Sequence, residues 1–395
     1  MVDFSISDEE RAMRSTVRTF VERELIPLES EIMRRGREGG SDVVTDDEMA
    51  ELQAKAKKFD LWGLSTPEEY GGLALPAVTR SLVEMEFGRS FIWFRPGGET
   101  DNILFHCNPE QAEIYLKPAI SGERKSCFAI TEPGAGSDAA NIRTSARRDG
   151  DDWIINGEKV FITGGNSSDF IICIAVTDSD KGTKGGFTAF LVDREMGYTT
   201  SPIETMGSAC PATIVLDNVR VPGSNVLGEV GQGWELAMSW IGKGRYLIPS
   251  RAVGGAERLL SLALQQANDR STFGKPIGTN QAIAWMIADS DVELEAARWL
   301  VLKAAWTVDN TASGSSASRH DSAIAKLYGT NMINRVVDRV MQIHGGMGYT
   351  REMPIEQWYR DVRLWRIFEG TDEMQRLIIS RDLLRGYTKI GGQLA

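Results

Sequence analysis

The sequence predicts a multidomain protein of the α and β type: an N-terminal helical domain, a central antiparallel β-domain and a C-terminal four-helix bundle. The chain has 395 residues, too many for one compact core, so two or three domains are expected. Apolar residues change from helical spacing to short β-rich runs near residue 125, and return to helical spacing near residue 233. We therefore expect domains at residues 1–124, 125–232 and 233–395.

The helical segments carry start signals. Ser7 and Thr45 each stand three residues before a glutamate, the pattern of a capping box, and Asn108 precedes a proline suited to a first turn. In the C-terminal segment apolar residues recur at helical spacing. Long helices with short connections indicate a bundle. The predicted helices cover residues 233–269, 280–309, 317–343 and 371–385.

The central segment consists of short apolar runs separated by turn sequences such as INGEK and DSDKGTKGG, which is typical of strands. No helix of useful length fits between these runs, so we expect an all-β module and not alternating βαβ units. The clearest runs are residues 153–155, 170–177, 186–193 and 212–222.

Composition excludes several classes of function. The formal net charge of −11 argues against a nucleic-acid partner, because phosphate binding needs a concentrated basic surface. No run of about 18 apolar residues predicts a membrane span, and residues 1–20 lack the apolar stretch of a signal peptide. Four scattered cysteines and three histidines favour neither disulfides nor a metal site, so we expect a cytoplasmic protein.

Three glycine-containing stretches are candidates for ligand binding. Residues 128–138, FAITEPGAGSD, predict an exposed turn that presents backbone N–H groups and the hydroxyls of Thr131 and Ser137. Residues 270–276, RSTFGKP, are consistent with a helix end or with an arginine fork for a pyrophosphate. Residues 342–352, QIHGGMGYTRE, are consistent with a helix end or with a close approach of backbone to a ligand.

Glu369 is the candidate catalytic residue. It lies in RIFEGTDE, where Thr371 is a suitable N-cap for the helix that follows, so the cap position is filled without Glu369. A lone glutamate is usually a solvated surface charge. Here the flanking Phe368 and Gly370 favour desolvation, which raises the proton affinity of a carboxylate as a general base for carbon acids requires.

Taken in this order and spacing, AITEPGAGSD, RSTFGKP, QIHGGMGYTRE and FEGTDEMQ resemble the landmarks of the acyl-CoA dehydrogenase family, and the resemblance covers essentially the whole chain. It implies the same three domains and an FAD cofactor, with part of each FAD site built across a subunit interface. The residues implied to bind FAD are Phe128, Ile130, Thr131, Gly136, Ser137, Phe161, Thr163, Arg270, Thr272, Phe273, Gln281, Gln342, Gly345, Gly346, Thr371 and Glu373.

The resemblance also implies the chemistry. Glu369 falls on the commonest position of the family's base, and would remove the α-proton of an acyl-CoA while the β-hydrogen leaves as hydride to flavin N5, giving a trans-2-enoyl-CoA. Some relatives place the base immediately before an arginine on the helix after the β-domain. Gly244 fills that position ahead of Arg245, so no second base is available there. Ser137, Arg245 and Gly370 are implied to contact the substrate.

Further expectations concern partners and the acyl group. The resemblance implies an electron-transfer flavoprotein as electron acceptor and a homo-oligomer, most often a tetramer. Gly242 and the short loop at residues 204–213 depart from the family near substrate contacts and leave the acyl group open. The aromatic cluster FIWF, residues 91–94, predicts either core packing or an acyl pocket reshaped for a small, branched or cyclic group.

Two alternatives stay open. The first is a related flavoenzyme of another reaction type, either an enoyl-CoA reductase or a nitroalkane oxidase; the latter carries aspartate as base, so the glutamate at 369 disfavours it. The second is a non-catalytic partner subunit. Such subunits lose the base or the FAD motif, and this chain keeps both.

Overall fold

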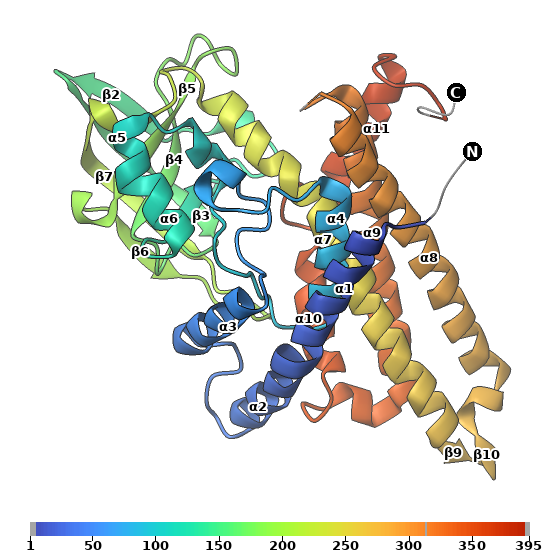
Figure 1. Cartoon of the computed structure of the whole chain (residues 1–395). Helices are drawn as coiled ribbons and strands as arrows, with labels where there is room; N and C mark the ends of the chain where they lie inside the picture. Colours follow the sequence, from blue (N-terminus) through green and yellow to red (C-terminus); the bar gives the residue numbers. More distant parts are fainter. Residues whose placement is uncertain (1–4, 313, 392–395) are drawn as a thin grey trace. The chain divides into compact units, whose positions relative to one another are not determined.

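The structure of the chain, a computed structural model, describes residues 5–312 and 314–391. Its internal contacts divide the chain into two compact units, which are described one at a time (Figure 1). Unit 1 comprises Met1–Leu61, Leu75–Pro96 and Lys243–Ala395, and unit 2 comprises Trp62–Ala74 and Gly97–Gly242. This division follows contacts, whereas the three domains expected above follow the type of secondary structure; their boundaries stay a prediction.

Unit 1 is helical, and the predicted start signals are confirmed. Ser7 and Thr45 each form a capping box, and the Thr371 hydroxyl accepts a hydrogen bond from the N–H of Met374. The helices are α1 (Asp8–Phe20), α2 (Ile26–Arg37), α3 (Asp46–Lys58), α4 (Ala77–Phe87), the larger part of α7 (Gly233–Asp269), α8 (Gln281–Asn310), α9 (Ser316–His344), α10 (Ile355–Leu364) and α11 (Asp372–Leu384).

All four predicted C-terminal helices are present, as α7, α8, α9 and α11. Helix α10 was not predicted, although Ile355, Trp358 and Val362 are buried at helical spacing and supply the signal for it. Helix α9 is the centre of the bundle, because it packs against α8, α10 and α11 (Figure 1). The stretch at residues 270–276 is more than a helix end: β9 (Ser271–Thr272) and β10 (Lys275–Pro276) form a small hairpin.

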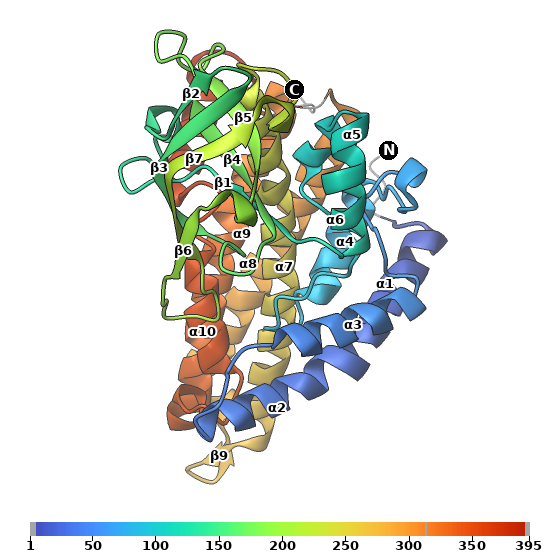
Figure 2. The ribbon, with the colours of Figure 1, turned by 90° about the vertical axis from the view of Figure 1, so that its left-hand side faces the viewer.

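Unit 2 is built on one sheet (Figure 2) with the strand order β6-β7-β3-β2-β4-β5-β8 and with β1 paired to β4. Short helices α5 (Pro109–Gln111) and α6 (Lys117–Ser121) accompany the sheet, and Asn108 forms the predicted cap of α5. The strands are β1 (Ser126–Ala129), β2 (Ser145–Asp149), β3 (Asp152–Ile162), β4 (Phe170–Val176), β5 (Phe187–Asp193), β6 (Thr199–Pro202), β7 (Ala212–Pro222) and β8 (Val226–Leu227).

The sheet is mainly antiparallel, as expected, but β1 and β2 each run parallel to β4. Strand β4 is buried on both faces because successive side chains enter two different cores. Ile172 and Ile174 pack with Leu116 of the helical segment, whereas Ile171 and Cys173 pack in the second core. Burial on both faces explains why the sequence of this strand is a continuous apolar run and does not alternate.

Within residues 5–312 and 314–391, no helix combines the length and the apolar character that crossing a lipid bilayer requires.

Candidate active site

Glu369 lies on the short loop between α10 and α11, in a conformation that L-residues seldom adopt. Its φ is +56°, and that of the following Gly370 is +90°. Two successive residues with positive φ reverse the chain sharply, at a cost of about 1–3 kcal/mol for a non-glycine residue. The half-buried Glu369 has its Oε2 atom shielded from solvent. The carboxylate therefore points into the protein, as its predicted role requires.

The carboxylate of Glu369 lies against Gly244 of α7. A Cβ atom added to Gly244 would be 2.0 Å from Oε2 and 2.4 Å from Cδ of Glu369. Any side chain at position 244 would therefore occupy the space that Glu369 fills. The two positions at which members of the resembled family carry their base converge here on a single volume, and Gly244 leaves that volume to Glu369.

Arg245, which the family resemblance implies contacts the substrate, adjoins the same loop. A terminal nitrogen of its guanidinium would be 3.9 Å from a Cβ added to Gly370. Burial lowers the pKa of Arg245, whereas the carboxylate of Glu369 acts to raise it. The Nε atom of Arg245 is buried and has no hydrogen-bond partner among the described residues. A buried cation next to Glu369 suits an anionic or strongly polar substrate group.

Two residues that were not predicted from the sequence donate hydrogen bonds to the backbone of the loop that carries Glu369. Lys326 of α9 is fully buried, and its Nζ atom donates to the carbonyl oxygen of Gly370 at 2.8 Å. Gln375 of α11 donates to the same oxygen, also at 2.8 Å. The signal for Lys326 was its place on the apolar face of α9, three residues after the buried Ala323 and seven before the buried Ile333.

A separate polar cluster fixes the glycine-rich turn of unit 2. Glu132 of that turn and Lys159 of β3 form a buried ion pair, with Nζ 2.8 Å from Oε1. Lys159 also donates to the carbonyl oxygen of Ile130 at 3.0 Å, and Glu132 accepts from the N–H groups of Arg143 and Thr144. Burial acts to raise the pKa of Glu132, but Lys159 and the N–H donors together hold it below its ordinary value.

This cluster positions the predicted ligand-binding turn without forming part of its surface. Gly136 and Ser137 are exposed, and Thr131 is half-buried. Phe128 and Ile130 are buried instead, and the Phe128 ring stacks on Trp240 at 4.4 Å between centroids. The side chains of Phe128 and Ile130 belong to the core of unit 2. These two residues would therefore contact a ligand through their backbone groups.

Exposed aromatic side chains mark two further predicted positions. Phe161 is the penultimate residue of β3, its side chain is 62% exposed and its φ is +59°. Phe273, at the turn of the β9–β10 hairpin, is 100% exposed with a φ of +50°. An apolar ring held in solvent by a constrained backbone suits contact with a flat cofactor or a neighbouring subunit. Thr163, beside Phe161, is exposed as well.

The remaining predicted residues of unit 1 are accessible to a ligand. Arg270 precedes the hairpin and Thr272 ends β9 beside the hairpin turn. Gln281 begins α8, Gln342 is in the last turn of α9 and Glu373 is in the first turn of α11. Gly345 and Gly346 present bare backbone, since an added Cβ would meet nothing within 4 Å. His344 is buried: its Nδ1 atom lies 2.8 Å from the carbonyl oxygen of Val340, and burial lowers its pKa.

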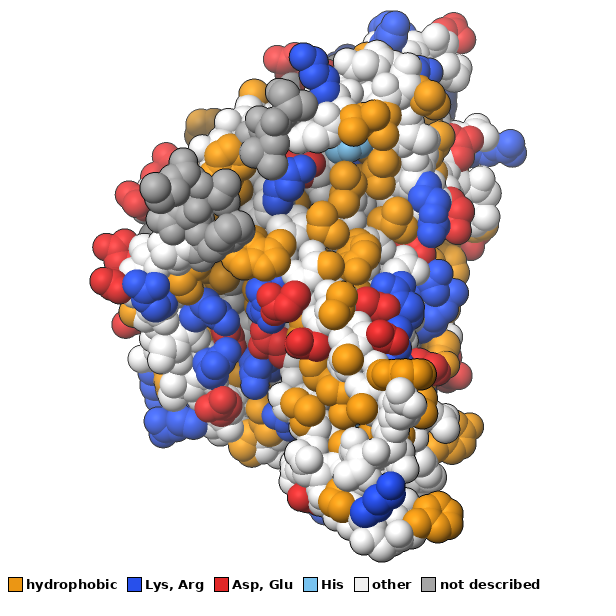
Figure 3. Space-filling model, turned by 90° about the vertical axis from the view of Figure 1, so that its right-hand side faces the viewer, with side chains coloured by type: hydrophobic (Ala, Val, Ile, Leu, Met, Phe, Trp, Pro, Cys, Tyr) orange, Lys and Arg blue, Asp and Glu red, His pale blue; other side chains and the backbone are white. Residues whose placement is uncertain are grey.

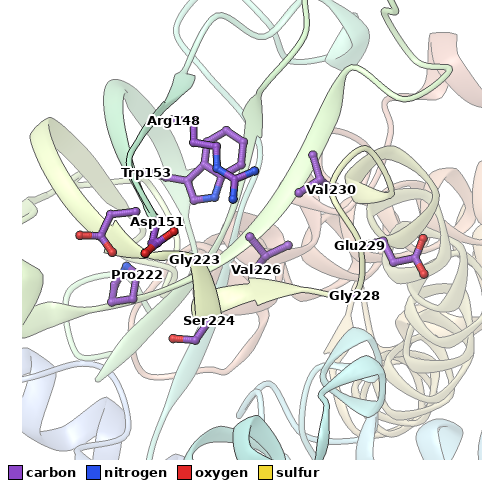
Figure 4. A pocket seen from close by; sticks show the side chains of 11 residues that line it. Arg148, Asp151, Trp153, Pro222, Gly223, Ser224, Val226, Gly228, Glu229 and Val230 are labelled. Carbon is purple, nitrogen blue, oxygen red and sulfur yellow. The ribbon is translucent and has the colours of Figure 1, made fainter.

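A recess of about 610 Å³ in unit 2 contains none of the predicted residues. Arg148 lies over the ring of Trp153 there, with Asp151 and Glu229 nearby (Figure 4). Its charges are of both signs, and its shape is open. The recess therefore offers no arrangement that resembles a catalytic centre.

Models of three consecutive protein-family domains match the chain. They are described as the N-terminal, middle and C-terminal domains of acyl-CoA dehydrogenase and match residues 7–123, 127–219 and 231–384. The chain is 36% identical to (R)-benzylsuccinyl-CoA dehydrogenase of Thauera aromatica, covering 97% of each chain. It is also 36% identical to the caffeyl-CoA reductase-Etf complex subunit CarC of Acetobacterium woodii, covering 96% of this chain and 99% of that one.

Solved structures agree with these relatives. Butyryl-CoA dehydrogenase from Megasphaera elsdenii superimposes with a TM-score of 0.84 at 30% identity, covering 97% of this chain and 100% of the other. The FAD complex of PigA superimposes with a TM-score of 0.86 at 25% identity, covering 98% and 100%. The matched domains, the relatives and the shared fold lead to one conclusion: the chain belongs to the acyl-CoA dehydrogenase family of FAD-dependent oxidoreductases that act on CH–CH bonds.

Proposed function

We propose that the protein dehydrogenates an acyl-CoA between its α- and β-carbons, with Glu369 as the base that removes the α-proton. The observation that carries this proposal is the placement of Glu369, whose inward-pointing carboxylate fills the space left by Gly244 beside the buried Arg245. A thioester α-carbon is a weak acid, so its carbonyl must be polarised as the proton leaves. The backbone N–H of Glu369 is the proposed donor to that carbonyl.

The residues present fit FAD. Phe161 and Phe273 hold exposed rings, and Gly136, Gly345 and Gly346 offer backbone that an added Cβ would not crowd. Ser137 and Thr163 supply exposed hydroxyls, and Arg270 supplies a cation for the pyrophosphate. Bound FAD supplies a two-electron acceptor for the β-hydrogen. The chain itself binds and orients both molecules and moves the α-proton to the Glu369 carboxylate.

Anaerobic mixing with an acyl-CoA tests the assignment of the base. The wild type should lose its yellow flavin absorbance, and the Glu369→Gln variant should lose it at least about a thousandfold more slowly while binding FAD normally. Gly244→Ala should also slow the reaction, because the added methyl group would overlap the Glu369 carboxylate. Flavin reduction by Glu369→Gln at the wild-type rate would contradict the proposal.

For the acyl group we propose a cyclic or aromatic substituent. The FIWF cluster divides into two parts: Phe91, Ile92 and Phe94 are buried core residues, with Phe94 stacked on Phe20 at 5.2 Å. Trp93 is half-buried and instead meets Phe368, the residue before the proposed base, edge to face at 6.4 Å between centroids.

Trp93 is also held rigidly. Its ring lies edge to face with Trp365 at 5.8 Å, and the buried Arg251 lies over it at 4.4 Å. A fixed aromatic wall beside Phe368 suits a flat ring better than a long flexible chain. The benzylsuccinyl and caffeyl groups in the names of the two relatives support the same class of substrate.

A panel of acyl-CoAs tests this substrate class. Aryl- and cycloalkyl-propionyl-CoA should reduce the flavin faster than straight chains of eight or more carbons. Trp93→Ala should reduce the preference about tenfold, in line with the 1–3 kcal/mol that one pocket contact contributes to discrimination. Phe94→Leu is the matched control, since it alters the neighbouring core residue and should leave the preference unchanged. Fastest reduction by the long straight chains would contradict the proposal.

The reverse reaction is the second candidate, because one relative is named as a reductase that acts within an Etf complex. The same base would then return a proton to the α-carbon, as microscopic reversibility requires. Enzyme reduced with dithionite should be reoxidised by the matching enoyl-CoA if this direction is open. The same name supports an electron-transfer flavoprotein as redox partner.

We also propose a homo-oligomer, most simply the tetramer that the family resemblance implies. Trp285, Val292, Trp299 and Trp306 recur every seven residues along α8, and their side chains are 42% to 70% exposed. Hydrophobic side chains gather along the face seen in Figure 3. A seven-residue repeat of large apolar residues suits packing against a helix of a second copy. Val292→Glu should produce smaller species in light scattering, whereas Glu295→Gln, on the same helix, should not.

A further inference from the structure

Lys326 is a buried cation in a place where hydrophobic residues predominate. It lies on the face of α9 that packs into the bundle and is fully shielded from solvent. Fully buried lysines are rare unless a partner compensates the charge. The contact of its Nζ atom is a neutral carbonyl, that of Gly370, at 2.8 Å. The ammonium therefore contacts the residue that follows the proposed base.

The loop that carries the base needs such support. Glu369 and Gly370 both have positive φ, and backbone of this kind persists only where neighbouring groups fix it. Gln375 already donates to the Gly370 carbonyl, and Thr371 caps the helix that follows. The Oδ2 atom of Asp372 accepts hydrogen bonds from Arg366 Nε, before the loop, and from Asn331 Nδ2 of α9, each at 2.9 Å. A neutral side chain could donate the same hydrogen bond to the Gly370 carbonyl. The need for a hydrogen-bond donor therefore does not explain why the residue at this position is a charged lysine.

The charges around Lys326 indicate what the ammonium adds. Glu369 precedes the carbonyl that Lys326 contacts, Asp372 and Glu373 lie in the first turn of α11, and Arg245 approaches from α7. Burial lowers the pKa of Lys326 to about 8, against the attraction of the three carboxylates, so the side chain is charged at pH 7. Attraction between an ammonium and a carboxylate favours the ionised form of both groups.

We propose that Lys326 is a positioning residue for the base: it fixes the Gly370 carbonyl, and with it the strained loop, and its charge keeps Glu369 ionised and ready to accept a proton. The inference rests on the proposed role of Glu369. Burial of a charge generally costs stability relative to an apolar residue of similar size. A buried charge that costs stability beside the proposed base is consistent with a role in function that goes beyond holding the loop.

The test compares three variants by the pH dependence of anaerobic flavin reduction by acyl-CoA. Lys326→Met removes both the donor and the charge, Lys326→Gln retains a donor without the charge, and Gln375→Leu removes the neutral donor to the same carbonyl without a change of charge. FAD content and the unfolding midpoint are recorded for each variant to establish that it is folded.

In both Lys326 variants the acid limb of the rate profile should move up by about one pH unit, because Glu369 loses a nearby cation. Lys326→Met should also slow the reaction about tenfold at its optimum through the loosened loop, and Lys326→Gln should slow it less. Gln375→Leu should slow the reaction without moving the limb. Substrate with deuterium at the α-carbon should show a larger isotope effect in Lys326→Met, since proton removal is the step affected.

An acid limb at the wild-type pH in both Lys326→Met and Lys326→Gln overturns the inference. If Lys326→Met does not fold, the Lys326→Gln profile decides the question by itself. Failure of the proposed function has a different signature, because Glu369→Gln would then reduce its flavin at the wild-type rate whatever the Lys326 variants do.

Discussion

Two lysines, one in each unit, are fully buried, and each holds a loop of the predicted site by a backbone carbonyl. Lys159 donates to Ile130 in the glycine-rich turn of unit 2, and Lys326 donates to Gly370 in the loop of unit 1 that carries the proposed base. Lys159 also forms an ion pair with Glu132 at 2.8 Å. Among the described residues no carboxylate lies within ion-pair distance of Lys326, although three carboxylates attract it from further away.

The difference indicates two uses of a buried charge. In unit 2 the charge is neutralised in place, and the Glu132 carboxylate accepts two backbone N–H groups besides Lys159, so the cluster acts as scaffold. In unit 1 the ammonium has been left without a close counter-ion, and one of the carboxylates that attract it is Glu369. The first arrangement serves the geometry of a turn. The second leaves an electrostatic effect available to a reacting group.

The largest expected effect comes from breaking the neutralised pair. Glu132→Gln leaves the Lys159 ammonium buried beside a neutral amide and should lower the free energy of unfolding by about 3–5 kcal/mol in chemical denaturation. The double variant Glu132→Gln/Lys159→Met should recover part of that loss, because no buried charge remains. A single variant within about 1 kcal/mol of the wild type would show that unit 2 does not depend on this pair.

The pH dependence of the free energy of unfolding tests the role of the second buried lysine, Lys326 of unit 1. The folded-state pKa of Lys326 is about 8, below its ordinary value of 10.5, so the folded chain binds fewer protons than the unfolded chain between those pH values. The destabilising contribution is therefore complete below pH 8 and disappears as the pH rises to 10.5. The wild type should gain up to about 3 kcal/mol relative to Lys326→Met over this range, by denaturation at each pH. A constant difference between the two proteins would contradict this.

The smallest expected difference in stability is between alanine substitutions of one glycine in each loop, Gly370 in unit 1 and Gly136 in unit 2. Gly370→Ala places a methyl group at a φ of +90° and 2.8 Å from Gln375 Nε2, and should cost about 1–2 kcal/mol of unfolding free energy. Gly136→Ala, in the turn of unit 2, meets nothing within 4 Å at an unstrained φ and should stay within about 0.5 kcal/mol. Equal costs at the two positions would mean that the loop of unit 1 is not under special constraint.

The fold was predictable because its signals are local. The capping boxes at Ser7 and Thr45, the four long C-terminal helices and the apolar runs of the sheet depend on residues close together in the sequence. The parallel pairing of β1 and β2 with β4 was not predictable, because it joins segments separated by other strands. Helix α10 had a local signal in Ile355, Trp358 and Val362 that was overlooked.

The site was predictable where chemistry and family resemblance coincide, as at Glu369, and not where support comes from distant segments. Lys159 stands 27 residues after Glu132, and Lys326 stands 44 residues before Gly370. No spacing rule connects such pairs. A general signal was available for both, namely a lysine in line with the apolar residues on the buried side of its strand or helix.

The contact between Glu369 and Gly244 limits how this family's proton acceptor can migrate along the chain. A carboxylate introduced at 244 would collide with the one at 369, and loss of the carboxylate at 369 alone would remove the proposed base. Each of these single substitutions would impair the enzyme. A move of the proposed base from position 369 to position 244 therefore requires both substitutions together. Homologues that carry both acidic groups, or neither, should therefore be scarce among working enzymes, and any that exist are the places to look for altered chemistry.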